Sequence, residues 1–475
     1  MKGIKDELLR RIREHEKLST GEQLKLVALL SVPAVIAQLS TILMFYIDDA
    51  MVGSLGANAS ASIGLVATTI WLVWSIVSCV STGFSVQVAH RIGANDFVGA
   101  RSVLRQSITV GIIVAAVTAT VGLSIAFRLP YWLGGTEAIV HDAGLYFFLF
   151  VLGAPLAMFE MLMCSMLRCA GNMHIPSMAG VWLCVLDVAF NFICIFPTRE
   201  LALAGLHFNM PGLGLGVAGA AVGSLMAEGL VAGWVTWYAL CRSKELRILG
   251  EAGSFIPEKN VLKKAGDIAG PVLLQRVLMN AAQITCTIIV APLGAVAIAA
   301  NVLGVTAESL CYMPGYGIGE AATTLVGQSV GARRSRLTER FAWMTTFVGI
   351  AVMSLMGVVM YVAAPLMMAS LTPDAAVRAL GTECLRIEAW AEPMFAASIV
   401  AMSCFVGAGD TRKPSMMNLI SMWGVRVTLA AALAPIWGLQ GVWTAMAIEL
   451  TFRGLIFLGR MKWGNWHERF MVISD

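Results

Sequence analysis

Long apolar stretches alternate with short polar ones along most of this chain, and their length predicts membrane-spanning helices. A helix needs about 20 largely apolar residues to cross the hydrocarbon core of a bilayer. Twelve stretches meet this requirement. They cover about residues 26–50, 62–87, 106–127, 143–164, 176–197, 214–239, 268–291, 297–325, 341–364, 384–404, 415–435 and 438–459.

The composition supports a membrane protein rather than a set of soluble domains. Of the 475 residues, 58% are hydrophobic and only 13% are charged, against about 25% charged in soluble domains. The mean hydropathy is +0.78. A soluble core cannot absorb so much apolar surface, so lipid must cover it. The net charge of +4 is too small to indicate nucleic-acid binding, and the scattered cysteines contain no CxxC pair that would indicate a disulfide framework or a zinc site.

The charges of the polar segments predict the orientation of the spans. With the N-terminus inside, most of the 33 Lys and Arg residues lie on the inner side, as the positive-inside rule requires. The outer segments hold only Arg128, Arg199, Arg378 and Arg386. Both termini are therefore expected in the cytoplasm. The expected order is a cytoplasmic N-terminal segment (1–25), an N-lobe (26–240), a cytoplasmic linker (241–265), a C-lobe (266–460) and a cytoplasmic tail (461–475).

The two halves are repeats of one another. Pro33 matches Pro271, 238 residues later, and the same offset relates Gly93-Ala94 to Gly331-Ala332 and Pro155 to Pro393. Because each half holds an even number of spans, the repeats are parallel and related by an axis along the membrane normal. The sequence thus predicts an all-α polytopic membrane protein with twelve transmembrane helices in two six-helix bundles related by pseudo-two-fold symmetry. Two such bundles can rock about a central cavity; the alternative is a relic of gene duplication without a mechanical role.

Residues 47–56 read Ile-Asp-Asp-Ala-Met-Val-Gly-Ser-Leu-Gly and follow Pro33 in the first span. This run resembles the first-helix signature of the multidrug and toxic compound extrusion (MATE) family, and further matches extend over nearly the whole chain. The resemblance implies a multi-pass exporter of the bacterial inner membrane. Such exporters extrude small organic, often cationic, compounds in exchange for H⁺ or Na⁺, without a further cofactor. The likeness is greater to the DinF-like branch of the family, and a monomer is expected.

Ionisable residues at membrane depth are the first functional candidates, because each costs about 2.5–3.5 kcal/mol to insert. Asp48 stands where the resemblance places a carboxylate in the first helix. A carboxylate in a low-dielectric site can take up and release a proton near neutral pH, and with Asp187 it could hold Na⁺ instead. The alternative is that Asp48 is simply hydrated at the outer interface. Asp49 points about 100° round the helix and is expected to be solvated or paired.

Asp187 and Asn191 lie four residues apart in the fifth span, so they share one helix face. The DinF-like branch has an Asn and then an Asp at this spacing, whereas here the order is reversed. This departure leaves both H⁺ and Na⁺ open as the coupling ion. We predict that Asp187 and Asn191 act with Asp48; the alternative is a packing or hydrogen-bonding role for the pair.

The second half holds other candidates. Glu388 and Glu392 are also four apart and precede Pro393, which suggests a C-lobe acidic site or a substrate contact. Arg276 occupies the stretch where another branch of the family carries a Glu. Since an unpaired buried cation is costly, we expect Arg276 to pair with a carboxylate such as Glu308 or Glu392.

Prolines recur at matching points of the two halves. Each removes one backbone hydrogen bond and permits a helix to bend. Bending at Pro33 could open or close the central cavity, and a fixed kink is the alternative. The four positions are Pro33, Pro155, Pro271 and Pro393.

Other function classes fit less well. The chain lacks a P-loop, so coupling to an ion gradient is expected rather than to ATP. A membrane-embedded enzyme would need a His or Cys constellation within the spans, but the six His residues lie in loops or at span ends; no enzyme activity and no resident metal are expected. A lipid-linked oligosaccharide or lipid flippase would favour cationic residues in its cavity, whereas the membrane-depth residues here are mostly acids. We therefore predict a secondary antiporter, with the flippase as the alternative.

Overall fold

The structure is a computed structural model that describes residues 2–203 and 206–466. Its first half contains α1 (Lys2–Arg13), α2 (Thr20–Gly53), α3 (Ala57–Gly93), α4 (Phe97–Ile125), α5 (Leu129–Trp132), α6 (Glu137–Cys169), α7 (His174–Ile195), β1 (Pro197–Leu203), β2 (Leu206–Leu213), α8 (Gly216–Trp237) and η1 (Tyr238–Arg242). Its second half contains α9 (Lys259–Val290), η2 (Ala291–Leu293), α10 (Ala295–Gly331), α11 (Ser335–Leu371), α12 (Ala375–Ala389), α13 (Glu392–Gly407), α14 (Arg412–Ser421), η3 (Met422–Val427) and α15 (Thr428–Trp463).

The helices account for the twelve predicted spans. Ten helical segments of the described residues are long and apolar enough to cross a membrane, and the bent pair α12–α13 adds an eleventh. The segment Arg412–Trp463 counts as one of the ten but is 52 residues long. It changes direction at Gly438, whose φ of 59° and ψ of −138° are not helical. This break divides the segment at the predicted boundary between spans 415–435 and 438–459. The division gives the twelfth span.

Two local features depart from the predicted helices. The predicted span 384–404 is not one straight helix, since α12 and α13 meet at a bend of 59°. Pro393 lies in the first turn of α13, where proline is tolerated because its missing N–H would have no helical partner. Between α7 and α8, the strands β1 and β2 pair antiparallel as a hairpin.

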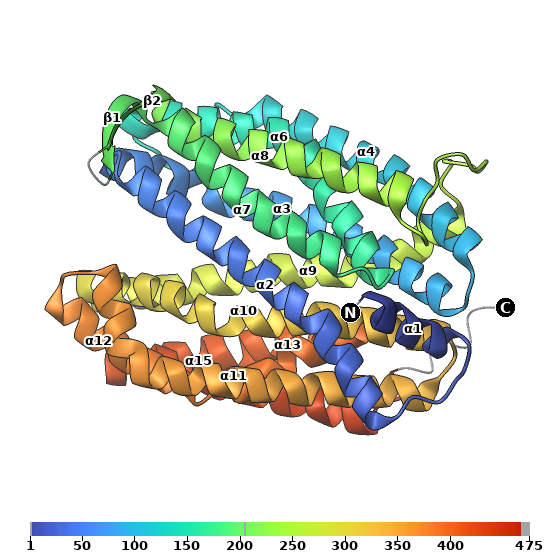
Figure 1. The fold of residues 1–475 in the computed structure, drawn as a ribbon. Helices are drawn as coiled ribbons and strands as arrows, with labels where there is room; N and C mark the ends of the chain where they lie inside the picture. Colours follow the sequence, from blue (N-terminus) through green and yellow to red (C-terminus); the bar gives the residue numbers. More distant parts are fainter. Residues whose placement is uncertain (1, 204–205, 467–475) are drawn as a thin grey trace.

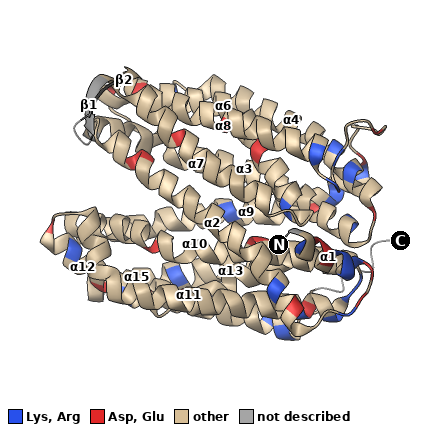
Figure 2. Ribbon diagram, in the orientation of Figure 1, with Lys and Arg blue, Asp and Glu red and all other residues tan. Residues whose placement is uncertain are grey.

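The two halves form two helix bundles that lie side by side, with α2 and α9 between them (Figure 1). The long helix α2 packs against α7 of its own half and against α10 of the other, while α9 packs against α3. Most Lys and Arg residues lie at one end of the bundles, opposite the β-hairpin (Figure 2). We refer to these two ends as the basic end and the hairpin end.

The bundles make close contact at the basic end. There, a Cβ atom on Gly93 of α3 would clash with the backbone of Gln328, and one on Gly331 of α10 would clash with the backbone of His90. Only glycine permits this approach of two backbones. The Gln328 side chain also donates a hydrogen bond of 2.9 Å to the carbonyl of Cys169. Towards the hairpin end, α3 and α10 expose large side chains such as Trp71 and Val302, and the bundles diverge (Figure 1).

The N-terminal helix α1 lies across the closed basic end. Its Leu8, Leu9 and Ile12 are buried in a cluster that includes Met173 from the first half and Leu337 from the second. This position explains why the short amphipathic segment is helical: its apolar side covers the junction of the two bundles, and its polar side faces outwards.

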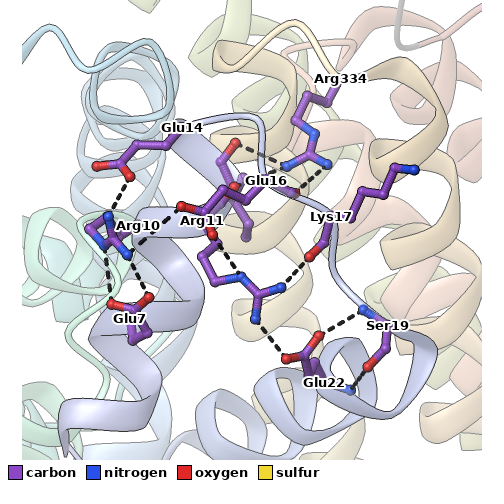
Figure 3. Close-up of polar contacts among 10 residues, drawn as sticks. Glu7, Arg10, Arg11, Glu14, Glu16, Lys17, Ser19, Glu22 and Arg334 are labelled. Atoms are coloured by element: carbon purple, nitrogen blue, oxygen red, sulfur yellow. Dashed lines mark hydrogen bonds and ion pairs between the residues drawn. The ribbon is translucent and has the colours of Figure 1, made fainter.

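Polar contacts join α1 to both halves. Arg334, just before α11, donates hydrogen bonds to the carbonyls of Arg11 (3.1 Å), Ile12 (3.2 Å) and Glu16 (2.9 Å), as Figure 3 shows. On the other side, Lys5 Nζ donates a hydrogen bond of 2.9 Å to the carbonyl of Gly171. The helix thus touches both bundles at the point where they meet.

Ion pairs and a helix cap fix the start of α2 beneath α1 (Figure 3). Ser19 and Glu22 form a capping box, which satisfies free N–H groups at the helix start. Arg11 Nη1 contacts Glu22 Oε1 at 2.6 Å. Within α1, the guanidinium of Arg10 donates to the Glu7 carboxylate at 2.6 Å and lowers the pKa of that carboxyl below its ordinary value.

Candidate functional site

Asp48 of α2 and the pair Asp187 and Asn191 of α7 lie together in the first half. The Asn191 amide nitrogen donates hydrogen bonds to Asp48 Oδ1 at 2.9 Å and to Asp187 Oδ2 at 3.0 Å. Asp187 is 2% exposed and Asn191 is 1% exposed, whereas Asp48 is half-buried. One amide therefore bridges two carboxylates from two different helices.

The helix α8 packs against Asn191 at this site. Ser224 Oγ lies 3.4 Å from the Asn191 amide nitrogen. Gly223 allows the approach, since a Cβ atom there would clash with Asn191 Oδ1. Ser224 was not among the candidates predicted from the sequence, although it directly follows Gly223.

The electrostatics of the site indicate a place for a cation. Neither Asp48 nor Asp187 forms an ion pair with Lys, Arg or His in the part of the chain that the structure describes. Asn191 Oδ1 is buried and has no hydrogen-bond partner within the same residues. A buried carboxylate beside a half-buried one, with no counter-charge, is costly, so the site favours a bound proton or metal cation.

The oxygen donors suit a hard cation such as Na⁺ as well as a proton. They are the carboxylates of Asp48 and Asp187, and oxygen ligands are preferred by hard cations. Among the described residues there is no cluster of three or more His, Cys, Asp or Glu of the kind that holds a metal ion. The neighbouring Asp49 is exposed and takes no part in the Asn191 bridge.

Two further acids extend the site towards the basic end. Glu228 of α8 interacts electrostatically with both Asp187 and Glu160 of α6, and Glu228 Oε1 is buried without a partner among the described residues. Glu160 Oε1 accepts a hydrogen bond of 3.1 Å from the Cys164 thiol. Neither Glu160 nor Glu228 was among the site residues predicted from the sequence.

The series of polar groups ends in an ion pair between the two halves. Arg168 of α6 contacts Glu320 of α10 at 2.8 Å, and Gln38 of α2 donates to the same carboxylate at 3.1 Å. Thr324 also donates a hydrogen bond of 3.0 Å to the Arg168 carbonyl. These contacts lie on the basic-end side of the acids and help to hold the bundles together there.

In the second half, Glu308, Glu388 and Glu392 lie near one another. Glu388 interacts electrostatically with both of the others, and all three are buried. The four carboxylate oxygens of Glu388 and Glu392 have no hydrogen-bond partner among the described residues. The predicted pair therefore sits at the bend between α12 and α13, a place where a cationic group could be accommodated.

The prediction that Arg276 pairs with Glu308 or Glu392 is wrong. Arg276 is exposed on α9 and forms no ion pair with Glu308 or Glu392 within the described residues. The helix α9 packs against α3 of the other half, so its orientation is not set by the acids of its own half. The cation that acts on Glu308 and Glu388 is Arg426.

Arg426 belongs to a buried ion cluster that sequence reasoning missed. Glu449 lies between two guanidinium groups, with Arg426 Nη2 at 3.1 Å and Arg453 Nη2 at 2.6 Å. The Ser421 hydroxyl donates a further hydrogen bond of 2.5 Å to Glu449. The spacing of Glu449 and Arg453 by four residues was a signal for their contact, but Arg426 comes from the preceding span.

A pocket of about 280 Å³ lies beside this ion cluster, between α9, α10, η3 and α15. Its lining includes Gln283, Cys286, Asn301, Thr306, Arg426 and Trp443. Cys286 follows Asp48 by 238 residues, the repeat offset. The second half therefore has a thiol where the first half has its half-buried carboxylate.

The four repeated prolines differ in their surroundings. Pro33, Pro155 and Pro271 lie inside α2, α6 and α9, whereas Pro393 begins α13 after the 59° bend. Pro33 is of greatest interest because α2 contacts both bundles and also carries Asp48.

Comparison with known proteins gives consistent matches over the whole fold. The model of the MatE family matches residues 33–193 and 271–432, in agreement with the repeat. A probable multidrug resistance protein NorM from Thermotoga maritima is 23% identical over 452 residues, which cover 94% of each chain. The multidrug resistance protein PmpM from Pseudomonas aeruginosa is 24% identical over 460 residues, 92% of this chain and 91% of its own length.

A solved structure has the same fold. It is described as the outward-facing conformation of a multidrug resistance MATE family transporter of the MOP superfamily. The match has a TM-score of 0.86 and 21% sequence identity, and it covers 95% of this chain and all of the other. It confirms the predicted fold of two six-helix bundles.

Proposed function

This chain belongs to the MATE family of membrane transporters, and from that premise we propose that it exports small organic, cationic compounds in exchange for H⁺ or Na⁺. It is a multi-pass transporter rather than an enzyme. The names of its relatives refer to multidrug resistance and do not favour the flippase alternative. The assignment to the DinF-like branch stays a prediction.

The observation that carries the proposal is the Asn191 bridge between Asp48 and Asp187. In the proposed cycle, the coupling cation enters from the hairpin end and binds to the two carboxylates. Binding neutralises their repulsion and changes the contacts of α2, which carries both Asp48 and Pro33. A change in α2 alters the cavity between the bundles and favours release of the substrate. Rocking of the two lobes then returns the site to the other side.

Coupling follows if cation and substrate compete for the same negative charge. A cationic substrate and the coupling ion each satisfy the carboxylates, so the two are expected to bind alternately rather than together. Glu228 and Glu160 continue the acidic series towards the basic end and support a route by which the coupling ion leaves. No cofactor beyond this ion is expected.

The location is part of the proposal. We expect an inner-membrane protein that acts as a monomer, with both termini in the cytoplasm. The concentration of Lys and Arg at the basic end (Figure 2) supports this orientation through the positive-inside rule. On this basis the two lobes are closed on the cytoplasmic side and diverge towards the outside.

The test is ethidium efflux from proteoliposomes under an imposed pH gradient or an imposed Na⁺ gradient. Asp48→Asn is expected to reduce gradient-driven efflux about tenfold or more, which corresponds to about 1.4 kcal/mol or more of lost interaction. Asp49→Asn is the matched control, because Asp49 is the adjacent carboxylate and is exposed. Wild-type efflux driven by one gradient identifies the ion. Equal efflux by both variants would remove Asp48 from the mechanism.

A further inference from the structure

The segment after η1 is folded back along α4 and held there by side-chain hydrogen bonds. The buried Arg105 donates a hydrogen bond of 3.2 Å to the Glu251 carbonyl, and Thr109 donates one of 2.7 Å to the Phe255 carbonyl. Gly253 fits against the Arg105 guanidinium, where a Cβ atom would clash. This part of the linker is therefore fixed against α4 by specific contacts.

A pocket of about 550 Å³ lies between the start of α4 and this linker. Four basic side chains and one acidic side chain line it. They are Arg101, Arg242, Lys244, Arg247 and Glu251. The single acidic side chain already has a partner, because Glu251 forms an ion pair with Arg101. Arg101 also donates a hydrogen bond of 3.2 Å to the Glu245 carbonyl. The pocket thus keeps an excess of positive charge.

Three of these cations are available to a ligand. Arg242, Lys244 and Arg247 are exposed, and none forms an ion pair with a carboxylate in the described ranges 2–203 and 206–466. Arg242 lies over the ring of Trp237, with its guanidinium carbon 5.6 Å from the ring centroid. This cation–π contact restricts the side chain, so its charge is held at the rim of the pocket.

The surroundings place the pocket at the edge of the bilayer. Trp237 is 49% exposed and Leu249, which lines the pocket, is 63% exposed. Tryptophan is enriched at the level of lipid headgroups. Further along α4, Ile112, Ile113 and Val117 present exposed apolar side chains of the kind that contact acyl chains. A ligand with a negative head and an apolar tail would satisfy both parts of this surface.

We propose that the pocket between α4 and the linker binds the phosphate group of an anionic phospholipid from the leaflet at the basic end. Arginine and lysine side chains bind phosphate oxygens through charge-assisted hydrogen bonds. Basic pockets at the cytoplasmic ends of transmembrane helices suit such headgroups. The lipid would join the start of α4 to the end of α8 and stabilise the linker between the two halves. This site is separate from the acids of the proposed ion site and does not depend on them.

The test compares two double variants of the full chain that lose the same charge. Arg242→Gln with Arg247→Gln removes two cations from the pocket, and Lys259→Gln with Lys263→Gln removes two exposed cations from the neighbouring start of α9. Purified protein in a neutral detergent is titrated with phosphatidylglycerol, with phosphatidylcholine and with inorganic phosphate. Bound lipid is counted by native mass spectrometry, and stabilisation is measured by the thermal melting temperature.

We expect phosphatidylglycerol to bind the wild type and the α9 variant with similar affinity and to bind the pocket variant about thirtyfold more weakly. This factor follows from about 1 kcal/mol for each cation lost. Equal binding by both variants would overturn the proposal, because the effect would then reflect net charge alone. Equal stabilisation by phosphatidylcholine would overturn it too. Equal stabilisation by inorganic phosphate would assign the pocket to a free anion instead of a lipid.

Discussion

The two lobes share a repeated scaffold but treat buried charge in opposite ways. In the first half, Asp48 and Asp187 share one amide and have no cationic partner among the described residues. In the second half, Glu449 lies between Arg426 and Arg453 at ion-pair distance. The first arrangement is open to a cation from outside the protein, whereas the carboxylate of the second is already paired with cations of the protein itself.

This difference shows how a duplicated fold can divide its tasks. At the repeat offset, Asp48 corresponds to Cys286 and Asp187 to Val425, which directly precedes Arg426. The second half has lost the two carboxylates and gained a guanidinium next to the same place. A symmetric scaffold therefore carries one site suited to an exchanging ion and one internal ion cluster suited to stability.

The largest expected effect comes from breaking the internal cluster. Glu449→Gln removes the carboxylate that lies between the buried Arg426 and Arg453, and loss of one member of a buried ion pair costs about 3–5 kcal/mol. Unfolding in mixed micelles should show this loss directly. Asp142→Asn, which removes an exposed carboxylate from α6, is the control and should unfold like the wild type. If Glu449→Gln were as stable as this control, Glu449 would not hold the two arginines in place.

The first-half site should respond in the opposite way, with a large change in transport and a small change in stability. Asp187→Asn removes one of the two carboxylates but keeps an amide of similar shape. We expect gradient-driven efflux to fall about tenfold or more, while the free energy of unfolding changes by less than about 1 kcal/mol, since the buried pair of like charges is relieved. Proteoliposome efflux and unfolding in micelles measure the two effects. A loss of stability as large as that of Glu449→Gln would show that Asp187 is structural.

A smaller effect is expected from the acids of the second half that have no partner. Glu388→Gln should raise the KM for a cationic substrate about fivefold, as expected for about 1 kcal/mol of lost attraction, and leave the dependence on the ion gradient unchanged. Initial rates over a range of ethidium concentrations separate these quantities. Loss of the gradient dependence in this variant would place ion coupling in both lobes. The first half would then not be the only one with an exchanging ion.

The smallest effect concerns pH and the helix α1. The Arg10 contact lowers the pKa of Glu7 below its ordinary value. The contribution of the Glu7–Arg10 contact to the stability of α1 is therefore fully present above the ordinary carboxyl pKa. It is lost as the pH falls through the lowered pKa of Glu7. We expect the amide protection factors of residues 2–13 to fall slightly below about pH 4, and Glu7→Gln to remove this dependence. Unchanged protection in the wild type at low pH would show that the contact does not stabilise α1.

Much of the fold could be predicted because hydropathy and charge act over whole segments. The twelve spans and the repeat follow from apolar length and from matched residues, and both agree with the fold of MATE transporters. The bend before Glu392 was missed, because a proline can begin a helix as well as lie inside one. The hairpin β1–β2 was missed although the sequence offers a signal, since Leu206, Phe208 and Met210 alternate with the polar His207 and Asn209 as in a strand.

The site was only partly predictable. Asp187 and Asn191 share a face because they are four residues apart on one helix, and the resemblance drew attention to Asp48. Ser224 could not be found from spacing, since its contact with Asn191 depends on how closely α8 approaches α7. Arg276 was given the wrong partner because the rotation of α9 about its axis is set by packing against α3.

The helix across the basic end has a consequence for the motion of the lobes. Two hydrogen bonds from Arg334 hold the end of α1 to the second half. In the first half, Lys5 of α1 donates to the Gly171 carbonyl and Asn95 donates to the Arg13 carbonyl at 3.4 Å. If this end opens during transport, α1 cannot keep both sets of bonds. Because Arg11 also ties α1 to Glu22 of α2, the contacts with Arg334 are the ones expected to break. The helix α1 would then act as a removable cover over the junction of the two lobes.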